Sequence, residues 1–234
     1  MAQPAPQPLP HSEPAPRARP ADAFLHLRRW LGIIGTALPF VLVLGNVFLR
    51  AVLKSPVEWR GWDLQRSMSA YYYTNMQNVF VGALITIGAF LLAYKGRDKR
   101  EARAGTVAGI SAVIVGLFPT VAPTGHFTVI SDSHVAFAAL LYLTLAYISI
   151  WLFPRQQDGV RQRDPARNVV YRVSGWTIVA CIVLIAVAEE HFVRASVGSY
   201  HPAFWLESLA TVAFGVSWLT KGEKILRDAD SQTR

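Results

Sequence analysis

Residues 189–207 read EEHFVRASVGSYHPAFWLE and join two long apolar segments of the chain. The last residue of this stretch, Glu207, lies inside the second apolar segment. A carboxylate within a membrane-length segment costs free energy, so such a residue is either paired inside the protein or functional. The stretch therefore predicts a helical membrane protein with a polar site at one face.

The composition also favours a membrane protein. The chain has 234 residues, of which 52% are hydrophobic and 16% are charged, and this balance is unusual for a soluble domain. The formal net charge of +8 comes from short basic clusters between apolar segments, so we expect no nucleic-acid partner. The single cysteine, Cys181, excludes an intramolecular disulfide and a cysteine-rich metal site.

Six apolar segments are long enough to cross a bilayer, because a membrane helix needs about 20 mostly apolar residues. They are residues 31–49, 78–94, 104–122, 134–153, 169–187 and 202–220. The fifth contains Arg172, whose charged end has to snorkel to the interface. The sequence predicts an all-α, polytopic membrane helix bundle with six transmembrane helices over residues 22–220. We expect a disordered proline-rich tail at 1–21 and a charged cytoplasmic tail at 221–234.

Lysine and arginine are unevenly divided between the segments that connect the spans. Of the 23 basic residues, 18 fall on the side of the two termini and 5 fall on the opposite side. Since cytoplasmic loops are enriched in Lys and Arg, both termini are predicted to be cytoplasmic. The short loops and the lack of a recognisable targeting segment favour the cell membrane of a bacterium, its inner membrane, with membrane lipids as partners.

With this topology, imidazole and carboxylate groups gather on the outer side. They are His126, His134, His191, His201, Asp132, Glu189, Glu190 and Glu207. Such groups are suitable zinc ligands, and they are equally suited to proton transfer. We expect His134, His201 and Glu207 to be the ligands if zinc is a cofactor. Because no pair of ligands shares one helical face, the site would be assembled from different helices.

A second polar stretch, residues 65–78 (QRSMSAYYYTNMQN), leads into the second span. If the helix begins near Ser67, polar residues form a continuous stripe along it: Ser67, Tyr71, Asn75, Asn78 and Gly82. The tyrosines also fit an aromatic belt at the interface. The residues predicted to bind a ligand are Tyr71, Asn75, Asn78 and Asp132.

The segment from Ser67 to Tyr73, with histidines and carboxylates at the outer ends of later spans, resembles the alkaline ceramidase and adiponectin-receptor superfamily of membrane hydrolases. The resemblance implies zinc-dependent hydrolysis of lipid amides or esters. This chain has Tyr73 where that family has a histidine four residues after the serine, and it has six predicted spans instead of seven. It is equally similar to DUF998-like bacterial multi-pass membrane proteins, which implies a fold but no activity.

Two hypotheses about function follow. In the first, the protein is not an enzyme, and its outer cluster is structural or binds a lipid, a small ligand or a partner. In the second, it is a hydrolase with Glu207, Ser67 and Ser69 as catalytic groups beside the zinc. A channel or transporter is less favoured, because charged residues are not expected in the cytoplasmic half of the spans. The hydrolase requires the outer ends of spans 2, 4 and 6 to meet.

Overall fold

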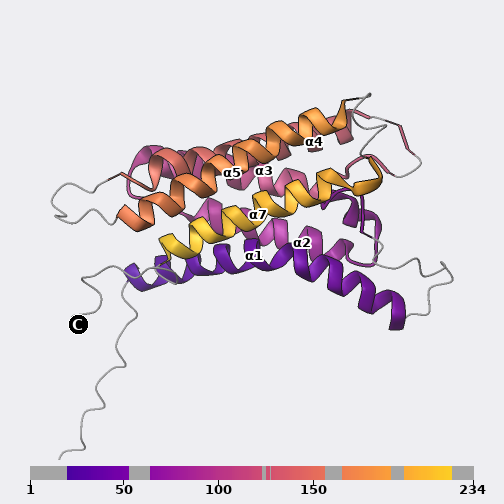
Figure 1. Ribbon diagram of the computed structural model, residues 1–234. Helices are drawn as coiled ribbons and strands as arrows, with labels where there is room; N and C mark the ends of the chain where they lie inside the picture. Colours follow the sequence, from indigo (N-terminus) through magenta and orange to yellow (C-terminus); the bar gives the residue numbers. More distant parts are fainter. Residues whose placement is uncertain are drawn as a thin grey trace, which may run out of the picture.

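The computed structural model is a bundle of long helices that lie side by side (Figure 1). It describes residues 20–52, 64–122, 125–126, 128–155, 165–190 and 198–222. These residues contain six long helices and no β-strand. The helices are α1 (Pro20–Val52), α2 (Gln77–Ala93), α3 (Lys99–Leu117), α4 (Val129–Tyr147), α5 (Pro165–Glu189) and α7 (Pro202–Lys221). Short 3-10 helices, Ser69–Tyr73 and Gly198–Tyr200, precede α2 and α7.

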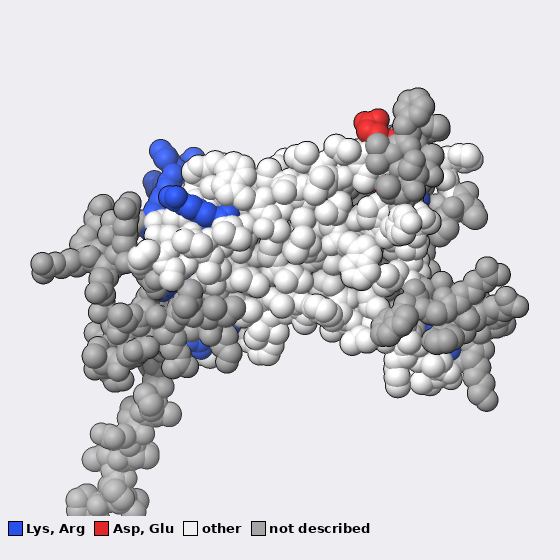
Figure 2. Space-filling view, in the orientation of Figure 1, with Lys and Arg blue, Asp and Glu red and all other residues white. Residues whose placement is uncertain are grey.

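Four stretches of helix are long and apolar enough to cross a membrane. They are Phe24–Val52, Val129–Leu152, Pro165–Glu189 and Pro202–Lys221. Helix α2 is apolar but has only 17 residues, and α3 begins with a charged turn. On the face seen in Figure 2, the charged side chains lie at the two ends of the bundle and leave the middle uncharged. These features support a multi-pass membrane protein.

Each of the six predicted spans falls on one of these helices. Helix α3 is displaced along the chain from its predicted span, because it begins at Lys99 and ends at Leu117, whereas the predicted span covers 104–122. Asp98 caps the start, since its Oδ1 accepts the backbone N–H of Glu101 at 2.7 Å. Phe118 is extended, because the residue before a proline disfavours helical geometry. The charged residues 99–103, predicted to lie in a loop, therefore belong to the helix.

Some sequence predictions fall on residues that the structure does not describe. Residues 1–19 of the predicted tail and residues 223–234 lie outside the described residues, as do His191 and Arg194. Helix α1 begins at Pro20, so it includes the last two residues of the predicted N-terminal tail. Helix α7 likewise includes Lys221, which was assigned to the C-terminal tail.

The helices close into a ring, because each packs on its neighbour in the chain and α7 packs on both α1 and α5. Glycines let two of these pairs approach closely. A Cβ atom on Gly32 of α1 would lie 2.8 Å from the carbonyl oxygen of Gly215 in α7. A Cβ on Gly88 of α2 would lie 2.9 Å from the carbonyl oxygen of Gly109 in α3. Backbone therefore packs against backbone at both contacts.

Helix α4 continues into a π-helical turn, Ile148–Leu152, that is buried except at Trp151. Within this turn, the hydroxyl of Ser149 lies 2.9 Å from the hydroxyl of Ser217 in α7. This hydrogen bond crosses the interior of the ring, so α4 and α7 are also joined directly.

Candidate functional site

Glu207 lies two turns into α7, near the end of the bundle where α2, α4 and α7 begin. We call this the outer end, after the predicted topology, and the opposite end the inner end. One carboxylate oxygen of Glu207, Oε2, accepts the backbone N–H of Met68 at 2.7 Å and that of Ser69 at 3.4 Å. The segment that leads into α2 therefore contacts α7 at Glu207.

Residues 64–76 form what we call the outer cap. The backbone N–H of Phe204 in α7 donates to the carbonyl of Arg66 at 3.2 Å. On the other side, Arg66 donates to the carbonyl of Val121 at 2.8 Å, and the Tyr73 hydroxyl donates to the carbonyl of Thr120 at 2.6 Å. The outer cap is therefore tied to the start of α7 and to the chain that follows α3.

Burial has an effect on the chemistry of Tyr73. Partial burial, with Tyr72 beside it, raises the pKa of Tyr73 above its ordinary value of 10.0. The hydroxyl therefore stays protonated at neutral pH and can donate to the carbonyl of Thr120.

The buried side chains of the cap are Met68, Ala70, Tyr71 and Met76, and all but Ala70 pack into a cluster with Phe204 of α7.

The predicted polar stripe is wrong, because α2 begins at Gln77 and not near Ser67. The Ser67 hydroxyl accepts the backbone N–H of Ala70 at 3.1 Å and so caps the short 3-10 helix. Thr74 donates to the carbonyl of Tyr71 at 2.8 Å and accepts from the N–H of Met76 at 3.1 Å. These local bonds compete with a continuous α-helix. Consequently Tyr71 is buried, whereas Asn75 and Asn78 are exposed.

The three predicted zinc ligands have different local surroundings. His134 is buried, and its Nδ1 donates to the carbonyl of Phe118 at 2.6 Å. His201 precedes α7 in the left-handed backbone region, with φ of 52°. Among the residues that the structure describes, no group of three or more His, Cys, Asp or Glu side chains is placed to hold a metal ion. His134, His201 and Glu207 are thus not brought together as a metal site. Asp132 is exposed in the first turn of α4.

A small internal cavity of about 50 Å³ lies beneath the outer cap. Its walls are mostly apolar, and Glu207, Ser69, Tyr142 and Thr211 contribute its polar atoms. The hydroxyls of Tyr142 and Thr211 lie 2.7 Å apart. A cavity of this size has room for a few water molecules but not for a lipid. A catalytic role for Ser67, Ser69 or Glu207 stays a prediction.

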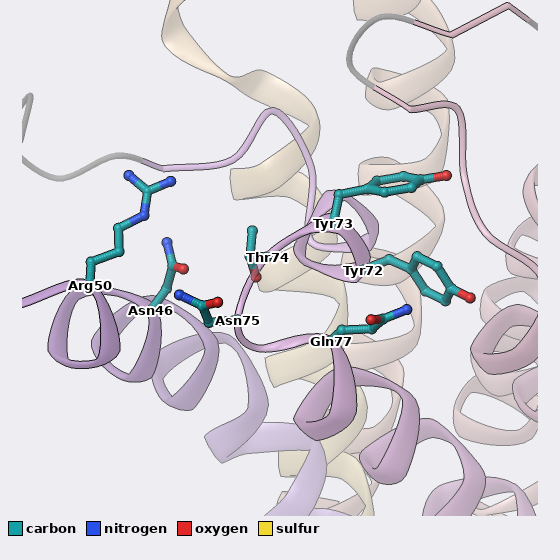
Figure 3. Close-up of a pocket in the computed structure, with 7 residues that line it drawn as sticks. All are labelled: Asn46, Arg50, Tyr72, Tyr73, Thr74, Asn75 and Gln77. Atoms are coloured by element: carbon teal, nitrogen blue, oxygen red, sulfur yellow. The ribbon is translucent and has the colours of Figure 1, made fainter. Parts of the chain in front are cut away.

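A larger polar pocket opens beside the outer cap, between the end of α1 and the start of α2 (Figure 3). Its volume is about 470 Å³. The described residues that line it carry amides, hydroxyls and one guanidinium, and none of them carries a carboxylate: Asn46, Arg50, Tyr72, Tyr73, Thr74, Asn75 and Gln77. The predicted ligand-binding residue Asn75 is among them, but Tyr71, Asn78 and Asp132 are not.

Asn46 distinguishes this pocket from an ordinary surface hollow. Its side chain is only 2% exposed, and its Oδ1 has no hydrogen-bond partner. Figure 3 shows Asn46 and Arg50 on the same side of α1, with Asn75 next to them. A buried polar atom without a partner is costly, at about 1–3 kcal/mol. The sequence analysis missed Asn46, although an amide inside the apolar segment 31–49 was a usable signal.

The inner end contains a network of buried charges. Glu101 is 2% exposed, and it accepts hydrogen bonds from the Tyr94 hydroxyl and, at 2.9 Å, from the backbone N–H of Arg97. The guanidinium of Arg97 extends to the end of the π-helical turn that follows α4. It donates to the carbonyls of Leu152 at 2.8 Å, Phe153 at 3.0 Å and Arg155 at 2.8 Å.

Further basic residues close the inner end around α7. Lys221 is buried, and its Nζ lies 4.8 Å from the centre of the Phe153 ring. Arg167 of α5 donates to the carbonyl of Thr220 at 2.9 Å, and Arg29 of α1 donates to that of Gly222 at 2.7 Å. The charges of the inner end are therefore not all solvated, since Glu101, Arg167 and Lys221 are buried. Several of these residues fasten helices together.

Comparison with known proteins found no matching family model, no matching curated protein and no matching solved structure. The two family resemblances therefore stay predictions from the sequence.

Proposed function

We propose that this chain is a six-span membrane protein, with both termini in the cytoplasm, that binds a neutral, hydroxyl-bearing group in the polar pocket at its outer end. The group is the headgroup of a lipid or a free small polyol. The observation that carries the proposal is Asn46, a nearly buried amide with an unpartnered oxygen in the wall of a pocket of about 470 Å³.

The residues of the pocket favour hydroxyl groups over simple ions. Asn46, Asn75 and Gln77 carry amides, each of which both donates and accepts, as a hydroxyl does. A phosphate dianion only accepts, so it has nothing to donate to the Asn46 oxygen. A cation would have no carboxylate partner among the described residues of the lining. The volume falls in the usual range of small-molecule sites, roughly 300–1,000 Å³.

In this proposal Glu207 is a positioning residue. It holds the backbone of Met68 and Ser69, and the same outer cap supplies Thr74 and Asn75 to the pocket. Glu207 does not line the pocket itself. Its role is to fix the segment from which four of the pocket's polar side chains extend, Tyr72, Tyr73, Thr74 and Asn75.

The binding test compares Asn46→Leu with the matched control Asn78→Leu, whose amide is exposed outside the pocket. The probe is monoglucosyl diacylglycerol against diacylglycerol, counted on the detergent-purified protein by native mass spectrometry. We expect wild type and Asn78→Leu to retain the glycolipid selectively and Asn46→Leu to lose about ten-fold in affinity.

Equal retention of the two lipids, or equal loss in both variants, would refute the proposal. A second arm separates the two sources of the hydroxyl group. If methyl glucoside displaces the glycolipid at equal concentration, the ligand is a free polyol. If it does not, the lipid is the ligand.

The six-span topology rests on the uneven distribution of Lys and Arg and on α2 and α3 filling the ring with the four longer apolar helices. A bacterial inner membrane is the location that we propose. The test uses a Cys181→Ser background with a new cysteine in place of Asn75 or Arg100. A membrane-impermeant maleimide should label the first in intact cells and the second only after lysis. The reverse pattern would invert the topology.

The zinc-dependent hydrolase has no supporting arrangement among the described residues. Elemental analysis of the purified protein and of a His134→Ala/His201→Ala variant tests it. Stoichiometric zinc in the wild-type protein that is absent from the variant would support the hydrolase hypothesis.

A further inference from the structure

A second pocket, at the inner end, lies between the end of α4 and the start of α5. Its volume is about 250 Å³, and its lining is Pro154, Pro165, Asn168, Val169 and Arg172. We propose that this pocket binds the phosphate of an anionic phospholipid through Arg172. The inference rests on the bundle lying in a membrane, and it is independent of the outer pocket.

Arg172 lies on the lipid-facing side of α5. It is seven residues past Pro165, which places it about 10 Å along the helix. Its neighbours on this surface are apolar and more than half exposed: Val169, Val173 and Trp176. A guanidinium on such a surface extends its charged end to the lipid phosphates.

Arg167, on the same helix, shows what Arg172 lacks. The Arg167 guanidinium is buried and donates to the carbonyl of Thr220 at 2.9 Å and to the hydroxyl of Tyr171 at 3.2 Å. Within the described part of the chain, no hydrogen bond or ion pair involves the guanidinium of Arg172. The guanidinium of Arg167 is therefore hydrogen-bonded within the protein, whereas that of Arg172 is open to a ligand.

The pocket suits a phosphate diester. The planar guanidinium can donate to two phosphate oxygens at once. Asn168, one turn before Arg172, offers an amide N–H, while Val169 and the two prolines form an apolar wall for the glycerol backbone. The phosphate would thus be held from one side by donors and from the other by apolar surface.

The charges around the pocket favour an anionic lipid over a zwitterionic one. Among the described residues no carboxylate lines the pocket, so the ammonium group of a zwitterionic headgroup would have no partner in this lining. Figure 2 shows Lys and Arg side chains gathered at the end of the bundle where α5 begins. Basic pockets between membrane helices at this level bind anionic headgroups.

The test measures how many phosphatidylglycerol molecules remain bound to the full-length protein after extraction from nanodiscs of equimolar phosphatidylglycerol and phosphatidylcholine. The variant is Arg172→Gln, and the matched control is Arg100→Gln, an exposed arginine of α3 outside the pocket. We expect Arg172→Gln to bind phosphatidylglycerol about five-fold more weakly and Arg100→Gln to bind it nearly as wild type does. Asn168→Leu should show a smaller loss.

An equal effect of the two arginine variants would mean general attraction of the lipid to a basic surface and would overturn the proposal, as would no effect of either. Displacement of the lipid by inorganic phosphate would identify a free anion as the ligand instead. Circular dichroism checks that Arg172→Gln is folded, which its exposed position leads us to expect. Asn46→Leu should leave this binding unchanged, so failure here is distinguishable from failure of the outer pocket.

Discussion

Each end of the bundle holds a carboxylate by hydrogen bonds, buried at Glu101 and partly buried at Glu207, but the two ends hold it in different ways. At the outer end, Glu207 accepts two backbone N–H groups from one capping segment. At the inner end, Glu101 accepts hydrogen bonds from Tyr94 and Arg97. Arg97 in turn donates to three carbonyls at the end of the π-helical turn and just after it, those of Leu152, Phe153 and Arg155. Side chains thus link Glu101 to several helices, whereas Glu207 accepts from the backbone of one peptide segment. The polar pocket lies where the attachment is simpler.

The comparison predicts its largest effect at Glu101. Replacing Glu101 with Ala removes the acceptor of Tyr94 and leaves Arg97 and Lys221 without their buried counter-charge. We expect a loss of about 3–5 kcal/mol in the free energy of unfolding, measured by thermal unfolding in detergent. Glu190→Ala, which removes an exposed acid at the outer end, is the control and should change little. Equal stability of the two variants would show that the inner network does not fasten the bundle.

A smaller effect is expected at Glu207. Glu207→Ala leaves the N–H of Met68 and that of Ser69 without their acceptor, at a cost of about 1–3 kcal/mol. Hydrogen exchange should become faster at the amides of residues 68 and 69 and stay unchanged in α3 near Glu101. If exchange accelerates at both ends together, the ends unfold as one unit and the contrast between them is wrong.

The smallest effect is expected at Asp98, which caps α3 at the inner end. The backbone N–H of Glu101 lowers the pKa of Asp98 below its ordinary value of 3.8. A depressed pKa means that the cap stabilises the folded state above pH 3.8 and that this contribution is lost as the pH falls below it. Asp98→Ala should therefore be less stable than wild type at pH 7, and the difference should disappear in acid. A difference that persists in acid would assign the effect to something other than the ionised cap.

The helices were predictable because their signals are local. Apolar segments of membrane length, a proline at the first position of α7 and a proline after α3 locate most of the boundaries. The sequence marked Glu207 as a costly carboxylate that is either paired inside the protein or functional, but it did not identify Met68 and Ser69 as its partners. The start of α2 did not follow, because Ser67 and Thr74 form local bonds that hydrophobic periodicity does not reveal.

The functional residues were predictable only in part. Asn75 was chosen from a stripe that does not exist, and it lines the pocket for a different reason. Glu101 gave no signal, because a buried acid beside a charged turn has the same sequence pattern as a solvated one. Burial of that kind depends on groups far along the chain, such as Lys221 of α7 and the carbonyls of Leu152 and Phe153 that bind Arg97, which a single sequence does not display.

The close contact of α1 with α7 has a consequence for biosynthesis. The ribosome releases α1 first and α7 last, so the glycine surface of α1 at Gly32 has no partner until the final helix is made. Helix α5 also packs on α7, so one of its faces likewise stays uncovered until α7 is made. Among the described helices, packing of α7 between α1 and α5 is therefore the last step of assembly. A chain that stops before residue 202 would enter the membrane with the α7-facing sides of α1 and α5 uncovered.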